Sequence, residues 1–142
     1  MAKSSDKIIQ LDVYLSVKRT DWTDKIKDLT LNLKMGKDLE EVSSYSLSYR
    51  QILIENLATM ASKMRSQKSI IEKNYKIKWI EYFEYDHRLS DKQREKFIDA
   101  DLSDDRQILE LLTLQKAFIE GSIKTLDNMG FAIKNRLDMS KL

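Results

Sequence analysis

The sequence predicts a mainly α-helical protein, built as a long antiparallel helical hairpin with a short helix between its two arms. Three observations favour this fold. The 142 residues include no proline and only three glycines, so little in the chain would interrupt a long helix. Apolar residues recur at steps of three, four or seven in two long segments, which is the spacing of one helix face. A short polar stretch separates these segments, and two long helices joined in this way most simply pack side by side in opposite directions.

Residues 1–37 show a different pattern and form a predicted N-terminal extension. Apolar residues occupy every second position in two stretches, first Leu11, Val13, Leu15 and Val17 and then Leu29, Leu31, Leu33 and Met35. Alternation with period two is typical of strands, and Gly36 would end the second one. A small β-ribbon is therefore expected here. Residues 22–27 between the stretches carry no hairpin turn signal, so a short helix is the alternative for that link.

Residues 38–102 are predicted to hold the first long helix, a turn and a short helix. From about Ser43 to Tyr85 an apolar stripe repeats with helical spacing, through Leu53, Leu57, Met60, Met64, Ile71, Tyr75 and Trp79. The polar residues 86–89 indicate a turn. Ser90 followed by Gln93 is a capping-box pattern, which predicts a short helix that continues to about Ile98.

Residues 103–142 form the predicted oligomerisation helix. Ser103 is its expected N-cap, and Asp104 and Asp105 fall in its first turn, where carboxylates interact favourably with the helix dipole. A heptad-like stripe runs through Ile108, Leu112, Gln115, Ile119, Ser122, Leu126, Met129, Ile133 and Leu137, and only its first half is widened, by Leu111, Leu114 and Phe118. A wide stripe followed by a narrow one predicts packing within the chain and then a seam for another copy. The expected oligomerisation residues are Leu126, Met129, Ile133 and Leu137.

Composition excludes several classes of function. The chain has no cysteine, which removes disulfides, thiolate metal sites and cysteine nucleophiles. Its single histidine, His87, has no second imidazole with which to share a metal. The acids Asp99, Asp101, Asp104 and Asp105 lack the glycine and terminal glutamate of a calcium loop. We therefore expect no enzyme activity, no catalytic residue, no bound metal and no cofactor.

Hydropathy argues against a membrane protein. No apolar run approaches the roughly 20 residues that span a bilayer, and the N-terminus lacks the apolar region of a signal peptide. Together with the absence of cysteine, this favours a soluble protein of the cytoplasm that does not associate with membranes.

One segment of the predicted long helix concentrates cations and aromatic rings. Residues 63–78 carry Lys63, Arg65, Lys68, Lys73, Lys76 and Lys78 against a single acid, and Trp79 and Tyr82 follow. Cations bind phosphates, and aromatic faces can stack on unpaired bases, so this segment is the predicted site for single-stranded nucleic acid. The alternative is an ordinary amphipathic helix with a solvated lysine face, in which Trp79 packs in the core. Residues 99–110 are acidic, and this separation of charge favours either an oriented electrostatic surface or docking of one segment against the other.

The C-terminal residues Gly130-Phe131-Ala132-Ile133-Lys134, followed by Asp138-Met139, resemble the closing segment of the UvsY recombination mediators of T-even-like bacteriophages. The order of features over residues 43–142 is similar as well. In that family a Lys-Ala-Arg-Leu motif, followed by an acid and paired aromatic residues, contributes to binding of single-stranded DNA. The similar stretch here is Lys76-Ile77-Lys78-Trp79 with Glu81, Tyr82 and Phe83. Lys78 stands in place of the arginine, which keeps the charge and loses the bidentate fork.

The resemblance implies a recombination mediator that binds single-stranded DNA and promotes loading of a recombinase. Its partners would be single-stranded DNA, the phage recombinase, the phage single-strand DNA-binding protein and further copies of itself in a ring, in the cytoplasm of the host cell. The alternative is a structural coiled-coil adaptor or assembly chaperone that does not bind nucleic acid.

Overall fold

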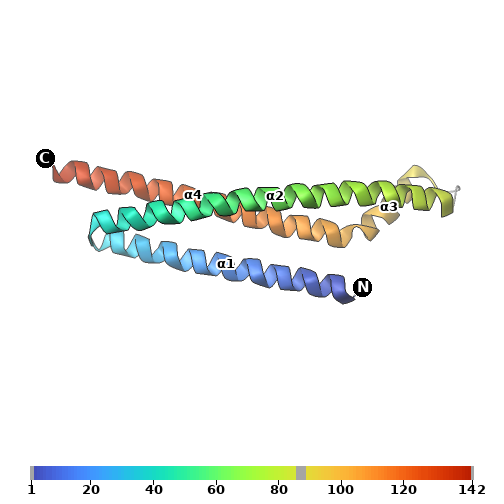
Figure 1. Cartoon of the computed structure of the whole chain (residues 1–142), viewed down its shortest axis with the longest axis horizontal. Coiled ribbons are helices and arrows are strands. Elements are labelled where there is room, and N and C mark those ends of the chain that lie inside the picture. The colour runs from blue at the N-terminus through green and yellow to red at the C-terminus, as the bar shows by residue number, and fades with distance from the viewer. Residues whose placement is uncertain (1, 86–88, 142) are drawn as a thin grey trace.

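The described part of the chain forms four α-helices. The computed structural model describes residues 2–85 and 89–141. The helices are α1 (Ala2–Lys34), α2 (Leu39–Tyr85), α3 (Asp91–Asp101) and α4 (Ser103–Ser140). The three long helices lie alongside one another, and α1 and α4 run in the direction opposite to α2 (Figure 1). The prediction of a mainly α-helical protein is confirmed.

The predicted N-terminal β-ribbon is wrong, because both alternating stretches are helical: all their residues lie within α1 except Met35, which directly follows its last residue, Lys34. The buried side chains of α1 recur at steps of seven, seven and four residues, at Leu15, Trp22, Leu29 and Leu33. Of the other members of the alternating sets, Leu11 is partly buried against the core, and Val13, Val17, Leu31 and Met35 are exposed. A helix is favoured because it places one aromatic ring and three leucines on a single face, and no proline or glycine interrupts α1.

Gly36 ends this helix rather than a strand. Its φ of 67° lies in the left-handed region, which glycine adopts without a steric penalty. The Gly36 N–H donates to Leu33 O at 3.2 Å and the Lys37 N–H donates to Asn32 O at 3.2 Å, which together form a Schellman motif. The Asp38 carboxylate then accepts a hydrogen bond of 3.0 Å from the backbone N–H two residues later and caps α2. The chain therefore reverses direction within a few residues.

α3 begins with the predicted N-cap, whereas α4 does not. Ser90 and Gln93 form the capping box, so this prediction is confirmed. Residues 86–88 of the predicted turn, which include His87, lie outside the described residues. Ser103 is the first residue of α4 and not its N-cap, since Leu102 occupies the cap position and makes no side-chain cap bond. A single residue therefore separates α3 from α4.

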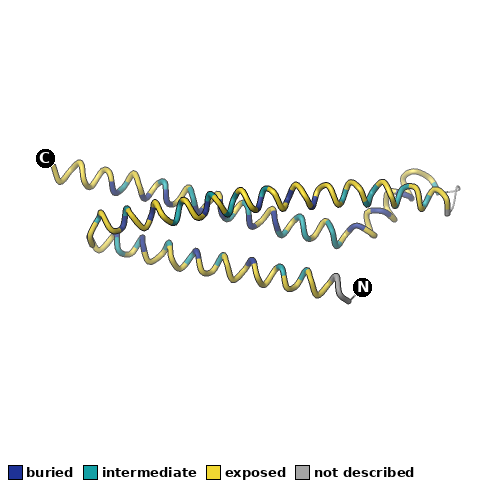
Figure 2. The backbone as a smooth tube through the Cα atoms, viewed as in Figure 1, coloured by how far each residue is buried: buried dark blue, intermediate teal, exposed yellow. Residues whose placement is uncertain are grey.

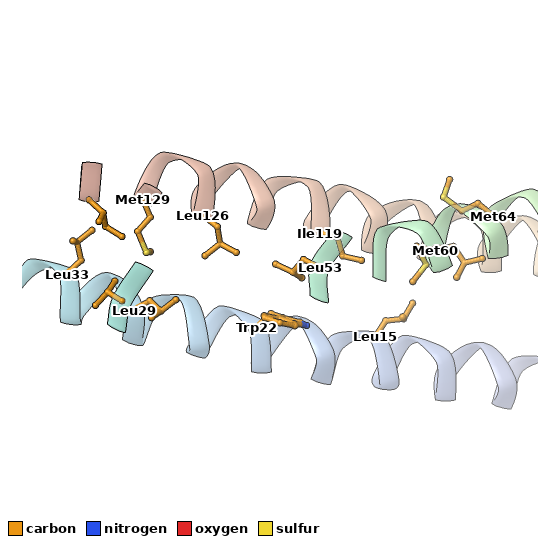
Figure 3. Close-up of a cluster of buried hydrophobic side chains, with 13 residues drawn as sticks. Leu15, Trp22, Leu29, Leu33, Leu53, Met60, Met64, Ile119, Leu126 and Met129 are labelled. Atoms are coloured by element: carbon orange, nitrogen blue, oxygen red, sulfur yellow. The ribbon is translucent and has the colours of Figure 1, made fainter. Parts of the chain in front are cut away.

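One elongated core runs between the three long helices. α2 spans about 70 Å at 1.5 Å per residue. Buried side chains line its inner face and the facing sides of α1 and α4, while the outer surfaces are exposed (Figures 2 and 3). The core contains Leu15, Trp22, Leu29, Leu33, Val42, Leu53, Met60, Met64, Leu112, Ile119, Leu126, Met129 and Ile133. Residues of α1 thus belong to the same core as those of α2 and α4.

This core changes the role of the predicted oligomerisation seam. Leu126, Met129 and Ile133 are only 1%, 5% and 3% exposed within their own chain. They are covered because both α1 and α2 pack along this half of α4, and the prediction of a ribbon did not anticipate the contribution of α1. These three side chains are therefore not available as a seam between copies. Leu137, 38% exposed, is the one residue of the four that the core leaves accessible.

Polar contacts between helices fix the register of α4. Arg19 of α1 donates to Gln115 Oε1 at 2.8 Å, and Arg50 of α2 pairs with Asp127 Oδ1 at 2.6 Å. Near the start of α4, Gln67 Nε2 donates to a backbone carbonyl at 2.8 Å. Because each bond joins a fixed position on two helices, α4 cannot slide by a turn without breaking all of them.

Candidate nucleic-acid interface

Five of the six predicted DNA-binding cations lie exposed on the second half of α2. Within residues 2–85 and 89–141, none of these five forms an ion pair: Lys63, Arg65, Lys68, Lys73 and Lys76. A surface cation without a carboxylate partner keeps its charge available for another anion. The sequence prediction of a basic segment at this place therefore corresponds to accessible charge.

The cations do not all share one face of the helix. Steps of four, four and three residues lead from Arg65 through Ser69 to Lys73 and Lys76, so these three cations form a stripe on the outside of α2. Lys63 instead faces α1, where it lines a groove between the two helices. The term outer basic stripe is used below for Arg65, Lys73 and Lys76.

Lys78, the sixth cation, is neutralised within the chain. Its Nζ lies 3.4 Å from Glu81 Oε2 and 4.0 Å from Asp101 Oδ2. Lys78 belongs to the basic segment of α2, and Asp101 belongs to the acidic segment and is the last residue of α3. The contact between them is one part of the docking expected between the two segments. Of the Lys76 and Lys78 pair in the family-like stretch, only Lys76 is left for a phosphate.

Trp79 is packed rather than free. Its ring stacks on Tyr75 with centroids 6.3 Å apart and an interplanar angle of 23°. The Arg94 guanidinium of α3 lies 4.9 Å from the Trp79 ring centroid and 5.2 Å from that of Phe83. These contacts correspond to the packing alternative for Trp79. A base that stacked on this face of Trp79 would compete with the Arg94 guanidinium.

Tyr82 is also engaged within the chain. Its hydroxyl donates to Asp101 Oδ2 at 2.6 Å, and its ring stacks on Phe97 with centroids 5.8 Å apart. The hydrogen bond to Asp101, with desolvation and the negative charges of Asp101 and Glu81, raises the pKa of Tyr82 above its ordinary value. The raised pKa extends to higher pH the range in which the phenol can donate this hydrogen bond from α2 to α3.

Other acids of the predicted cluster have structural roles. Asp99 pairs with Arg106 at 3.1 Å, and Asp105 accepts a hydrogen bond of 3.2 Å from Asn74. Among the described residues no group of three or more histidine, cysteine, aspartate or glutamate side chains is placed to hold a metal ion. These carboxylates join α3 and α4 to each other and to α2.

Arg94 is the functional-site residue that sequence reasoning missed. It is 4% exposed, its guanidinium contacts two aromatic rings, and one of its NH groups donates to Leu89 O at 3.3 Å. The signal that could have found it is the spacing of Arg94 and Ile98, four residues apart in a helix whose other positions are polar or exposed. Arg94 holds α3 on the aromatic end of α2.

We expect Arg94→Ala to release α3 locally without unfolding the three-helix core. A desolvated cation on an aromatic ring contributes about 1–2 kcal/mol, so amide protection in residues 91–101 should fall about 5- to 30-fold. Hydrogen exchange measures this directly. Arg94→Met, which keeps the aliphatic length, separates loss of charge from loss of packing. Unchanged exchange in both variants would show that Arg94 does not anchor α3.

Comparisons with known proteins add no function to this geometry. The chain matches no model of a protein family, no curated protein and no solved structure. Within the described residues, no helix combines the length and the apolar character needed to cross a membrane. What the chain does must therefore be inferred from its own contacts and charges.

Proposed function

We propose that this protein binds single-stranded DNA and acts as a recombination mediator, which helps a recombinase to load onto DNA coated with single-strand DNA-binding protein. The observation that carries the proposal is the set of five exposed cations on α2, between Lys63 and Lys76, that have no ion partner in the described part of the chain. A strand bound there would release the counterions condensed on its phosphates, so its affinity would fall as the salt concentration rises.

The distribution of these cations around α2 supports a flexible strand over a duplex. Lys63 faces α1 while Arg65, Lys73 and Lys76 lie on the outer stripe. A single strand can bend to follow charges on different sides of a helix, and a stiff duplex cannot do so over such a short distance. The resemblance of residues 76–83 to the UvsY motif points to the same segment.

Assembly and partner exchange belong to the proposal as well. Several copies in a ring would bring weak sites together and raise the affinity for long strands through effective concentration. Self-association would have to use apolar side chains outside the core, such as Phe131, Leu137 and Met139 near the end of α4. In this proposal the protein acts in the cytoplasm of a phage-infected cell.

A second candidate function, a helical adaptor without a nucleic-acid role, is favoured by a different observation. Ile9, Val13 and Val17 recur every four residues and are each more than half exposed on α1. Such a stripe is typical of a surface that binds another helix.

Titration of a labelled single-stranded oligonucleotide distinguishes the two functions. The wild-type chain should bind it with a logarithm of affinity that falls linearly with the logarithm of salt concentration, and a duplex of equal length should compete poorly. Fluorescence anisotropy at several salt concentrations measures both. Absence of salt-dependent binding would leave the adaptor as the better account. The mediator role is checked by adding the protein to recombinase and strand coated with single-strand DNA-binding protein, where the lag before recombinase assembly should shorten.

A further inference from the structure

A groove between α1 and α2 gathers cations and aromatic rings that no sequence pattern brought together. It has a volume of about 350 Å³ and lies between α2 and the middle of α1, from Leu11 to Lys25. Its lining includes three lysines, Lys18 and Lys25 from α1 and Lys63 from α2, against one acid, Asp21. The groove therefore carries an excess of positive charge.

Aromatic rings hold the two α1 lysines in place. Lys18 Nζ lies 5.5 Å from the ring centroid of Tyr14, and Lys25 Nζ lies 4.8 Å from that of Trp22. Neither lysine, nor Lys63, forms an ion pair within the described ranges of the chain. A cation–π contact positions an ammonium group but leaves its charge uncompensated. The groove thus presents fixed cations to an incoming anion.

The groove also offers a surface for a flat ring and donors for hydrogen bonds. Tyr14 lines it and is 56% exposed, so part of its ring is accessible. Asn56 and Thr59 contribute an amide and a hydroxyl from α2. Phosphate-binding cations beside an accessible aromatic ring match a nucleotide unit of a single strand better than a free anion, which has no ring to stack.

We infer that the groove between α1 and α2 is a second binding site for single-stranded nucleic acid, with phosphodiesters on Lys18 and Lys25 and a base on Tyr14. This inference rests on the proposed function and extends it. Lys63 lines the groove and begins the run of free cations on α2, so a strand that left the groove would pass on to Arg65 and the rest of the outer basic stripe. The binding path then covers two helices and not one.

The test replaces both α1 lysines, as Lys18→Ala with Lys25→Ala, in the full chain. If each contacts one phosphate, the salt slope for a labelled oligo(dT) should fall by about 1.4, which corresponds to about 25-fold weaker binding at 0.1 M salt. The matched control is Lys27→Ala with Lys34→Ala, which removes the same charge from the same helix but on its side toward α4. The control should bind nearly as the wild type does.

Further variants keep the test decisive. Lys18→Gln with Lys25→Gln retains polar side chains of similar reach and should lose as much affinity as the alanine pair. Tyr14→Ala should weaken binding at least about fivefold, and Tyr14→Phe, which keeps the ring, should not. If the wild type binds and both lysine pairs bind like the control, the groove site is wrong while the proposed function stands. If the wild type does not bind the oligonucleotide, both are wrong.

Discussion

Met129→Asp is expected to unfold the three-helix core, not to separate intact subunits. Met129 is 5% exposed and belongs to the same core cluster as Leu126 and Ile133. Figure 3 shows its side chain on the side of α4 that faces Leu29 and Leu33 of α1. A carboxylate there would be buried without a partner, which costs several kcal/mol, and the lost packing adds about 2–5 kcal/mol. These losses are comparable to the total stability of a typical domain, about 5–15 kcal/mol. Circular dichroism should show an early or absent thermal transition.

Met139→Asp is the matched control for this prediction. Met139 lies ten residues further along the same helix and is 72% exposed, so the same substitution should leave the melting temperature nearly unchanged. If Met129→Asp melted like the wild type and sedimented as a smaller species, the side chain would have to lie between copies. The packing of α1 on α4 would then be wrong.

The repeat of apolar residues predicted the faces of the helices but not their neighbours. The stripe of α4 is buried at Leu112, Gln115, Ile119, Ser122, Leu126, Met129 and Ile133, as a helical repeat requires. The end of α2 at Tyr85 agrees with the prediction and its start lies four residues earlier, at Leu39. Periodicity alone does not say whether such a face packs against the same chain or against another copy. For α4, the structure shows that this face packs within the same chain, with α1 as one of its neighbours.

The misassignment of α1 has a local cause. Leucines and valines at every second position satisfy a strand pattern, but Leu15, Leu29 and Leu33 also satisfy a helical one. Only the position of Trp22, seven residues from Leu15 and from Leu29, separates the two interpretations. Tertiary packing favours the helix because it buries all four side chains in the shared core.

The sequence predicted the positive charge of the candidate site but not which of its side chains have partners within the chain. The excess of cations over residues 63–78 can be counted from the sequence, and the split into an outer stripe and a groove residue follows from 3.6 residues per turn. Two contacts depend on how α3 folds back onto α2: the ion pair of Lys78 with Asp101 and the cation–π contact of Arg94 with Trp79. Contacts 15 to 23 residues apart in sequence leave no local pattern.

The second large effect is expected from Arg65→Ala, Lys73→Ala and Lys76→Ala combined. These three cations are exposed on the outer basic stripe and pair with no carboxylate in the described part of the chain, so the fold should not depend on them. Loss of three phosphate contacts, at about 0.7 each, should reduce the salt slope by roughly 2 and weaken binding about 100-fold at 0.1 M salt.

A second triple variant controls for net charge. Lys124→Ala, Lys134→Ala and Lys141→Ala remove the same number of charges from α4 and its C-cap, Lys141. The C-terminal end of α4 is remote from the C-terminal end of α2 (Figure 1). This variant should keep most of the affinity, because charges separated by more than about 10 Å are largely screened at 0.1 M salt. Equal losses in the two variants would indicate attraction to the whole protein and not a site.

The salt dependence of single-strand affinity, measured in parallel for the wild type and the two triple variants, distinguishes a nucleic-acid site on α2 from general attraction to the protein. Binding through α2 predicts a slope that is smaller by roughly 2 for the Arg65, Lys73 and Lys76 variant, and a slope close to that of the wild type for the α4 variant. The same slope and affinity in all three proteins would contradict a nucleic-acid site on the outer basic stripe of α2.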